Sequence, residues 1–155
     1  MGSHRVLDHT ADVGLEIAGA TLEDLFEEAA IGLFALITDG PVSPTGEVGV
    51  ALSAPDLESL LVRWLNELLF LQATEGWLLS AFRVAIGRAG EAGLSLEARA
   101  VGRRGGPGRT GQRREVKAAT YHGLKVEPAV PAEPAGTRGV PGEGGPYRAT
   151  VIFDI

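Results

Sequence analysis

The chain has 155 residues, a formal net charge of −6 and no cysteine. Without cysteine it has no disulfide bridge, thiolate zinc site or cysteine nucleophile. Its negative charge argues against a protein that binds nucleic-acid phosphates by itself. The hydrophobic content of 45% and the charged content of 22% are those of a globular protein, so we expect one domain over residues 1–155.

No apolar run reaches the roughly 18 residues of a membrane span. No positively charged segment followed by an apolar one opens the chain, as a secretory signal would require. We therefore expect no membrane partner and a cytoplasmic location. The segment Gly2-Ser3-His4 is either an expression scar or native sequence, and we assign it no function.

The first two elements are a short strand over residues 13–17 and a helix over residues 22–37, in which apolar residues recur at helical spacing. Thr21 is a suitable N-cap, and the acidic first turn suits the positive end of the helix dipole. Thr38 and the Asp-Gly-Pro that follows favour a turn and should end the helix.

A second strand is predicted over residues 47–52, and a second helix over residues 57–73 after the turn-forming segment 53–56. The apolar residues of this helix form one wide stripe that must be buried. Trp64 belongs to that stripe, so we expect its side chain in the core.

Strand patterns dominate the second half of the chain, over residues 77–87, 94–102, 114–127 and 147–155. Because these strands follow one another without helices between them, they favour an α+β class. We expect a two-layer sandwich in which an antiparallel or mixed sheet is covered by the two main helices.

Two segments rich in Gly and Pro are predicted to be flexible loops, over residues 103–114 and 128–146. The first carries five arginines, which could touch phosphate. It contains no aromatic residue for base stacking, so we favour a solvated loop over a nucleic-acid site.

The last residues, TVIFDI, keep Val151, Phe153 and Ile155 on one face of a strand, which implies that even the final side chain is packed. The terminal carboxylate would then lie beside that of Asp154, and two adjacent negative groups repel each other unless a cation or hydrogen-bond donors compensate. A third carboxylate from the opening motif DHTAD would complete an oxygen-only site. Such a site suits calcium, magnesium or manganese better than zinc.

Four segments, in this order along the chain, resemble the archease family: HTADVGLEI, LLVRWLNELLFL, EVKAATYHGLKV and the closing YRATVIFDI. The resemblance implies an accessory protein and not an enzyme. Archeases assist the RtcB-type RNA ligase in tRNA splicing and RNA repair, by promoting guanylylation of the ligase and allowing multiple turnover. RNA would then be contacted only indirectly, through the ligase.

The resemblance also implies the site residues. The family's metal ligands match Asp12, Asp154 and the terminal carboxylate of Ile155, and its functional lysine matches Lys117. We expect a divalent cation, calcium first, with magnesium or manganese as alternatives. As structural alternatives, Asp12 would be a turn residue, Asp154 an outward strand residue and Lys117 a solvated edge lysine.

The neighbouring polar residues are given structural roles. We expect His9 to be a hydrogen-bonding group more often than a metal ligand, and Asp8 and Thr10 to be cap or turn residues. Tyr121 and His122 are expected to support the sheet.

The chain departs from the family pattern at the arginine-rich loop and at the insertion over residues 128–146. These departures put partner specificity in doubt more than the ion ligands.

Two other functions remain open. A metal-dependent phosphoester hydrolase would suit an aspartate cluster with a lysine, although the chain has no phosphate-binding loop of the P-loop type and no evident nucleophile. A metal-independent, chaperone-like binding module would need exposed apolar surface but no ion.

Overall fold

The computed structural model describes residues 2–8, 12–38, 43–104, 115–128 and 147–155. The strands form two antiparallel sheets. The larger sheet has the order β1-β2-β8-β6, and β7 also pairs with β8. Its members are β1 (Gly2–Asp8), β2 (Asp12–Gly19), β6 (Ala118–Thr120), β7 (Val126–Pro128) and β8 (Tyr147–Asp154).

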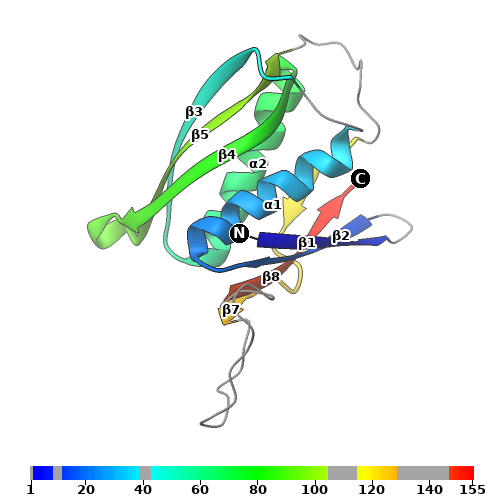
Figure 1. The fold of residues 1–155 in the computed structure, drawn as a ribbon. Helices are drawn as coiled ribbons and strands as arrows, with labels where there is room; N and C mark the ends of the chain where they lie inside the picture. The colour runs from blue at the N-terminus through cyan, green and yellow to red at the C-terminus, as the bar shows by residue number, and fades with distance from the viewer. Residues whose placement is uncertain (1, 9–11, 39–42, 105–114, 129–146) are drawn as a thin grey trace.

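The smaller sheet has the order β3-β5-β4. Its members are β3 (Gly46–Ala54), β4 (Trp77–Arg88) and β5 (Leu94–Arg104), and a short 3₁₀ turn, Gly90–Ala92, connects the last two. The helices α1 (Leu22–Ile37) and α2 (Leu57–Glu75) lie between the two sheets (Figure 1).

Contacts of α1 with both sheets show this arrangement. On one side, the ring of Phe34 lies 5.9 Å from that of Phe82 in β4. On the other, Gly32 faces Leu15 of β2 so closely that a Cβ at Gly32 would lie 2.7 Å from a Leu15 methyl group. The α+β class with two main helices and antiparallel strands is confirmed. The arrangement differs from the expected two layers with one sheet, because the helices form a middle layer.

The two helices begin where the sequence predicted. The Thr21 hydroxyl accepts a hydrogen bond from the Asp24 N–H at 3.0 Å, and the Asp56 carboxylate accepts one from the Ser59 N–H at 2.8 Å. Helix α2 ends at Glu75, two residues later than predicted, and is capped by Gly76, whose φ of 74° lies in the left-handed region that glycine adopts without strain.

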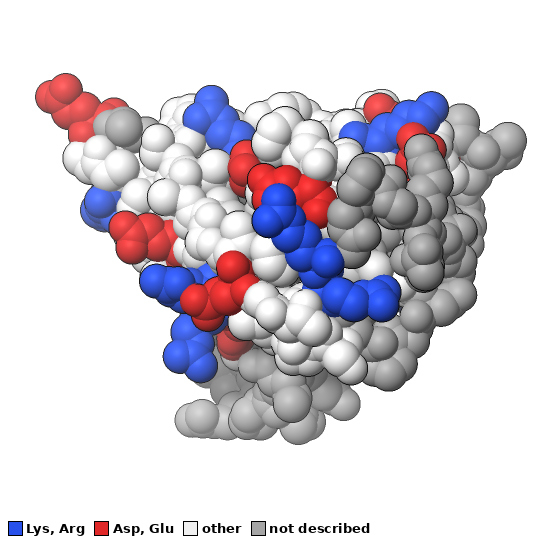
Figure 2. Space-filling model, turned by 90° about the horizontal axis from the view of Figure 1, so that it is seen from above, with Lys and Arg blue, Asp and Glu red and all other residues white. Residues whose placement is uncertain are grey.

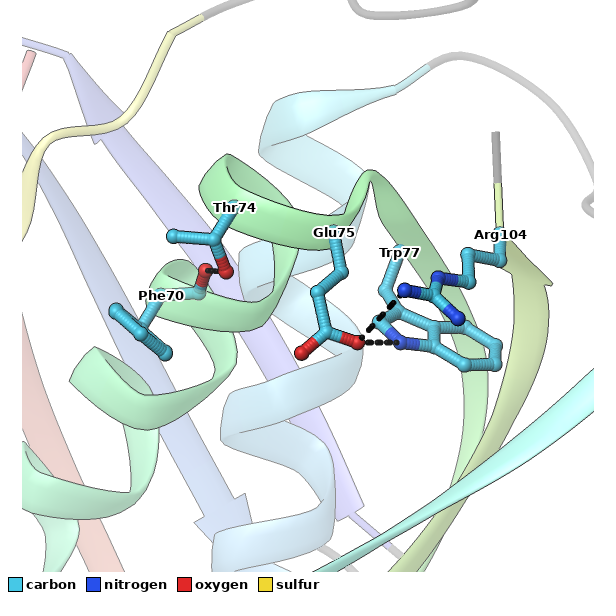
Figure 3. A network of polar contacts seen from close by, with 5 residues as sticks. All are labelled: Phe70, Thr74, Glu75, Trp77 and Arg104. Atoms are coloured by element: carbon cyan, nitrogen blue, oxygen red, sulfur yellow. Dashed lines mark hydrogen bonds and ion pairs between the residues drawn. The ribbon is translucent and has the colours of Figure 1, made fainter. Parts of the chain in front are cut away.

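A polar cluster fixes the end of α2 against the smaller sheet (Figure 3). The Glu75 carboxylate accepts a hydrogen bond from the Trp77 indole N–H at 3.3 Å and lies 3.4 Å from the guanidinium of Arg104. The hydroxyl of the preceding residue, Thr74, donates to the Phe70 carbonyl one turn earlier in the helix at 2.7 Å. Strand β5 extends to Arg104 and pairs with β4 there, so it includes Arg103 and Arg104, which the sequence assigned to a loop. Residues 105–114 and 129–146, the rest of the two predicted loops, lie outside the described residues.

Two further differences concern the larger sheet. Strand β1 was not predicted, yet it pairs with β2 along its whole length, from Gly2 opposite Gly19 to Asp8 opposite Val13. The single strand predicted over residues 114–127 is divided into β6 and β7 by a turn at Gly123, where φ is 64°.

Tyr121 and His122 precede this glycine and lie outside the strands, with exposed side chains. The expectation that they support the sheet is therefore wrong.

The buried apolar side chains form one core cluster between the sheets. Trp64 is fully buried, as predicted, and its indole N–H donates to the Phe26 carbonyl at 2.9 Å. Phe153 is fully buried, and Ile155 packs partly buried against the same cluster, so the prediction of a packed final residue is confirmed. Neither described helix combines the length and apolar character that crossing a bilayer requires.

Candidate functional site

Asp12 and Asp154 lie directly opposite each other on neighbouring strands. Asp12 begins β2, Asp154 ends β8, and the antiparallel register pairs the two residues. In Figure 1 the end marked C lies beside the start of β2. The adjacent Val13 and Phe153 are fully buried against the helices. Because side chains alternate between the faces of a strand, the two aspartates point to the opposite face of the sheet, away from the helices.

The paired aspartates place two negative charges beside each other. Directly opposite residues in an antiparallel sheet have Cα atoms about 4.5–5.5 Å apart, and like charges in this arrangement destabilise the pair of strands. Asp12 is half-buried and Asp154 is exposed. None of the ion pairs found among the described residues includes either of them.

Lys117 reaches the same end of the sheet from a third segment. Its backbone N–H donates to the Asp154 carbonyl at 2.8 Å, and the next residue, Ala118, is the register partner of Asp154. The row across the sheet is therefore Asp12, Asp154 and Ala118. The Lys117 side chain is exposed, and within the described part of the chain its ammonium group takes part in no ion pair.

The donor set at this position suits a hard divalent cation. Asp12 and Asp154 offer carboxylate oxygens from two adjacent strands, and the carboxyl group of Ile155 follows Asp154 by one residue. Calcium, magnesium and manganese prefer oxygen ligands of this kind.

The described residues contain no group of three or more His, Cys, Asp or Glu side chains able to hold a metal. A cation here would therefore need the terminal carboxylate, and water or a partner for its remaining ligands.

The rest of the opening motif is only partly described. Asp8 ends β1 opposite Val13. His9 and Thr10 lie outside the described residues, so the roles expected for them stay predictions.

Sequence reasoning missed two polar residues of α2 that contact the segment carrying Lys117. Asn66 forms two hydrogen bonds with the backbone of Ala119, and the Glu58 carboxylate accepts one from the Val126 N–H at 2.8 Å. The available signal was weak: both are polar positions, eight residues apart, in a helix otherwise judged by its apolar stripe.

Figure 2 shows that basic and acidic side chains adjoin each other on one face of the molecule. The described residues of this face form no continuous basic surface of the kind that nucleic-acid phosphates require.

Comparison with known proteins identifies the family. The model of the archease protein family (MTH1598/TM1083) matches residues 4–155. A "Protein archease" of Methanosarcina mazei is 36% identical over 153 residues, which cover 98% of this chain and 95% of the relative. The chain belongs to the archease family. The resemblance in the four sequence segments is thereby confirmed.

Other archeases give the same result. A "Protein archease" of Sulfurisphaera tokodaii is 38% identical over 128 residues, covering 82% of this chain and 90% of that one. The solution structure of protein 1598 of Methanobacterium thermoautotrophicum matches with a TM-score of 0.74 and 34% identity, covering 98% of both chains. The archease fold therefore extends over nearly the whole chain.

Proposed function

We propose that this archease activates an RtcB-type RNA ligase in the cytoplasm, promoting its guanylylation and multiple turnover during tRNA splicing and RNA repair. The observation that carries the proposal is the convergence of Asp12, Asp154 and the Lys117 segment at one end of the larger sheet. Family membership supports an accessory protein of this kind. The net charge of −6 fits a protein that leaves RNA binding to its partner.

Asp12, Asp154 and the terminal carboxylate of Ile155 are the proposed ligands of a divalent cation, with calcium first and magnesium or manganese as alternatives. When bound, the cation would supply positive charge beside the phosphates of the ligase's nucleotide. The two aspartates contribute oxygens from strands held in fixed register. Lys117 extends an exposed ammonium group that can pair with a phosphate or with the carboxylates themselves.

A guanylylation assay with the cognate ligase tests the proposal. The variants are Asp12→Asn, Asp154→Asn and Lys117→Ala, and the matched control is Glu16→Gln. Glu16 lies on the same strand and the same face as Asp12, but pairs with Arg5 at 2.6 Å. We expect the three site variants to lose stimulation of the ligase and the control to keep it. Stimulation that survives in both aspartate variants would refute the role of the carboxylates.

The same preparations separate the alternative functions. Phosphatase or nuclease activity of the purified chain, lost in the aspartate variants, would indicate a hydrolase. Stimulation that is unchanged by a chelator and by all three substitutions would indicate a metal-independent binding module.

A further inference from the structure

Strand β6 is supported by a helix side chain on the edge that faces away from β8. It has three residues and, among the described strands, pairs only with β8. At its other edge, the Ala119 N–H donates to the Asn66 side-chain oxygen at 2.8 Å, and the Asn66 amide nitrogen donates to the Ala119 carbonyl at 3.2 Å. Asn66 thus satisfies both backbone groups of Ala119, as a neighbouring strand would.

An asparagine suits this role because its side-chain amide carries a donor and an acceptor at the spacing of a peptide group. The helix that presents it is held firmly, since the adjoining Trp64 and Leu65 are fully buried. One end of α2 makes a similar contact, in which Glu58 accepts a hydrogen bond from Val126 of β7. The segment from Lys117 to Val126 therefore lies between β8 on one side and α2 on the other.

This support bears directly on Lys117, which lies two residues before Ala119. The Lys117 N–H bonds to the Asp154 carbonyl at 2.8 Å, so the residue keeps its place beside Asp154 only while β6 remains paired. Three residues of strand pairing hold the segment weakly, because each hydrogen bond contributes little net stability and short edge elements open locally.

We propose that Asn66 is a positioning residue, which holds Lys117 beside the Asp12–Asp154 pair by closing the open edge of β6. Its effect on ligase activation rests on the proposed function above. The positioning itself does not, and can be measured on the isolated chain.

The first test is amide hydrogen exchange by NMR on the parent chain and on Asn66→Ala, without ligase. We expect the amides of Ala119 and Lys117 to exchange about tenfold faster in the variant. The amides of β2 and β8 that pair Asp12 with Asp154 should keep their protection, which also shows that the variant is folded. Unchanged exchange at Ala119 and Lys117, or an equal loss of protection throughout the sheet, would overturn the inference.

The second test is stimulation of ligase guanylylation by Asn66→Ala. The matched control is Glu58→Ala, which removes a helix-to-strand hydrogen bond from the far end of the same segment. We expect Asn66→Ala to lower stimulation about tenfold and the control to keep it. Equal losses in Asn66→Ala and Glu58→Ala, or full stimulation by Asn66→Ala, would show that Asn66 does not act by positioning Lys117.

The two tests also separate the two proposals. A parent chain that fails to stimulate the ligase would refute the proposed function, while faster exchange in Asn66→Ala would still establish the positioning of Lys117.

Discussion

Replacing Asp12 by asparagine should change the stability of the chain in opposite directions with and without a divalent cation. Asp12 and Asp154 are register partners on adjacent strands, and no ion pair found among the described residues neutralises either. In the absence of a cation, the substitution removes a repulsion and loses no such pair. In its presence, the substitution removes one of the proposed ligands.

The size of both effects follows from general magnitudes applied to this pair of residues. Two charges about 5 Å apart repel by about 0.8 kcal/mol in water, and Asp154 is exposed enough for the dielectric to be nearly that of water. This repulsion lies within the range of about 0.2–1 kcal/mol for the interaction energy of a cross-strand side-chain pair. At a cation concentration of 100 times Kd, cation binding raises the free energy of unfolding of the parent by about 2.7 kcal/mol. The variant lacks this stabilisation. Asp12→Asn should therefore be about 0.8 kcal/mol more stable in chelator, and about 2 kcal/mol less stable in saturating calcium.

Thermal unfolding in EDTA and in saturating calcium chloride measures both values. For a chain of this size, 1 kcal/mol corresponds to a shift in Tm of about 2–4 °C. Glu16→Gln is the control, since it removes an exposed ion pair with Arg5 and should lower Tm slightly and equally in both solutions. If the same one of the two proteins, parent or Asp12→Asn, is the more stable in both solutions, a shared cation at the aspartate pair is refuted.

Three further predictions concern the fold. Trp64→Phe should lower the free energy of unfolding by about 2 kcal/mol in urea denaturation, because it removes the hydrogen bond to Phe26 and leaves a void in the core; a loss below about 0.5 kcal/mol would contradict this. Gly76→Ala should cost about 1 kcal/mol by the same measurement, because φ is 74° at this position. The backbone hydrogen bond from Ser59 lowers the pKa of Asp56 from its ordinary value of 3.8. The stability that the ionised Asp56 carboxylate contributes is therefore complete above pH 3.8 and is lost as pH falls through the lower folded-state pKa. Asp56→Asn should accordingly lose less stability than the parent on acidification below pH 3.8.

The helices could be predicted from the sequence because the groups that begin and end them are local. Helix α1 has the predicted bounds, with Thr21 bonding to a backbone group three residues away. The end of α2 was placed too early, because Gly76 follows the apolar stripe by several residues.

Strand positions were also largely predictable, but their distribution between two sheets was not. Pairing joins residues far apart in the chain, such as Asp12 with Asp154, and the alternation of apolar residues does not specify a partner. Strand β1 has a mixed sequence, GSHRVLD, without a clear alternation.

The candidate site was only partly accessible to sequence reasoning. A packed chain end placed the Ile155 carboxylate beside Asp154, and the family resemblance supplied Asp12 and Lys117. Asn66 could not be found in this way, because its partner is the backbone of Ala119, 53 residues away. Backbone groups do not depend on the residue type, so the sequence does not indicate which of them a side chain will contact.

The residues of the candidate site differ in how firmly the fold holds them. Asp12 and Asp154 belong to the continuous pairing of β2 with β8, which extends from Asp12 opposite Asp154 to Gly19 opposite Tyr147, so their register does not depend on β6. Lys117 precedes a three-residue strand whose outer edge depends on Asn66. Perturbations of α2 should therefore move Lys117 while leaving the aspartate pair in place, which makes cation binding and ligase activation separable by mutation.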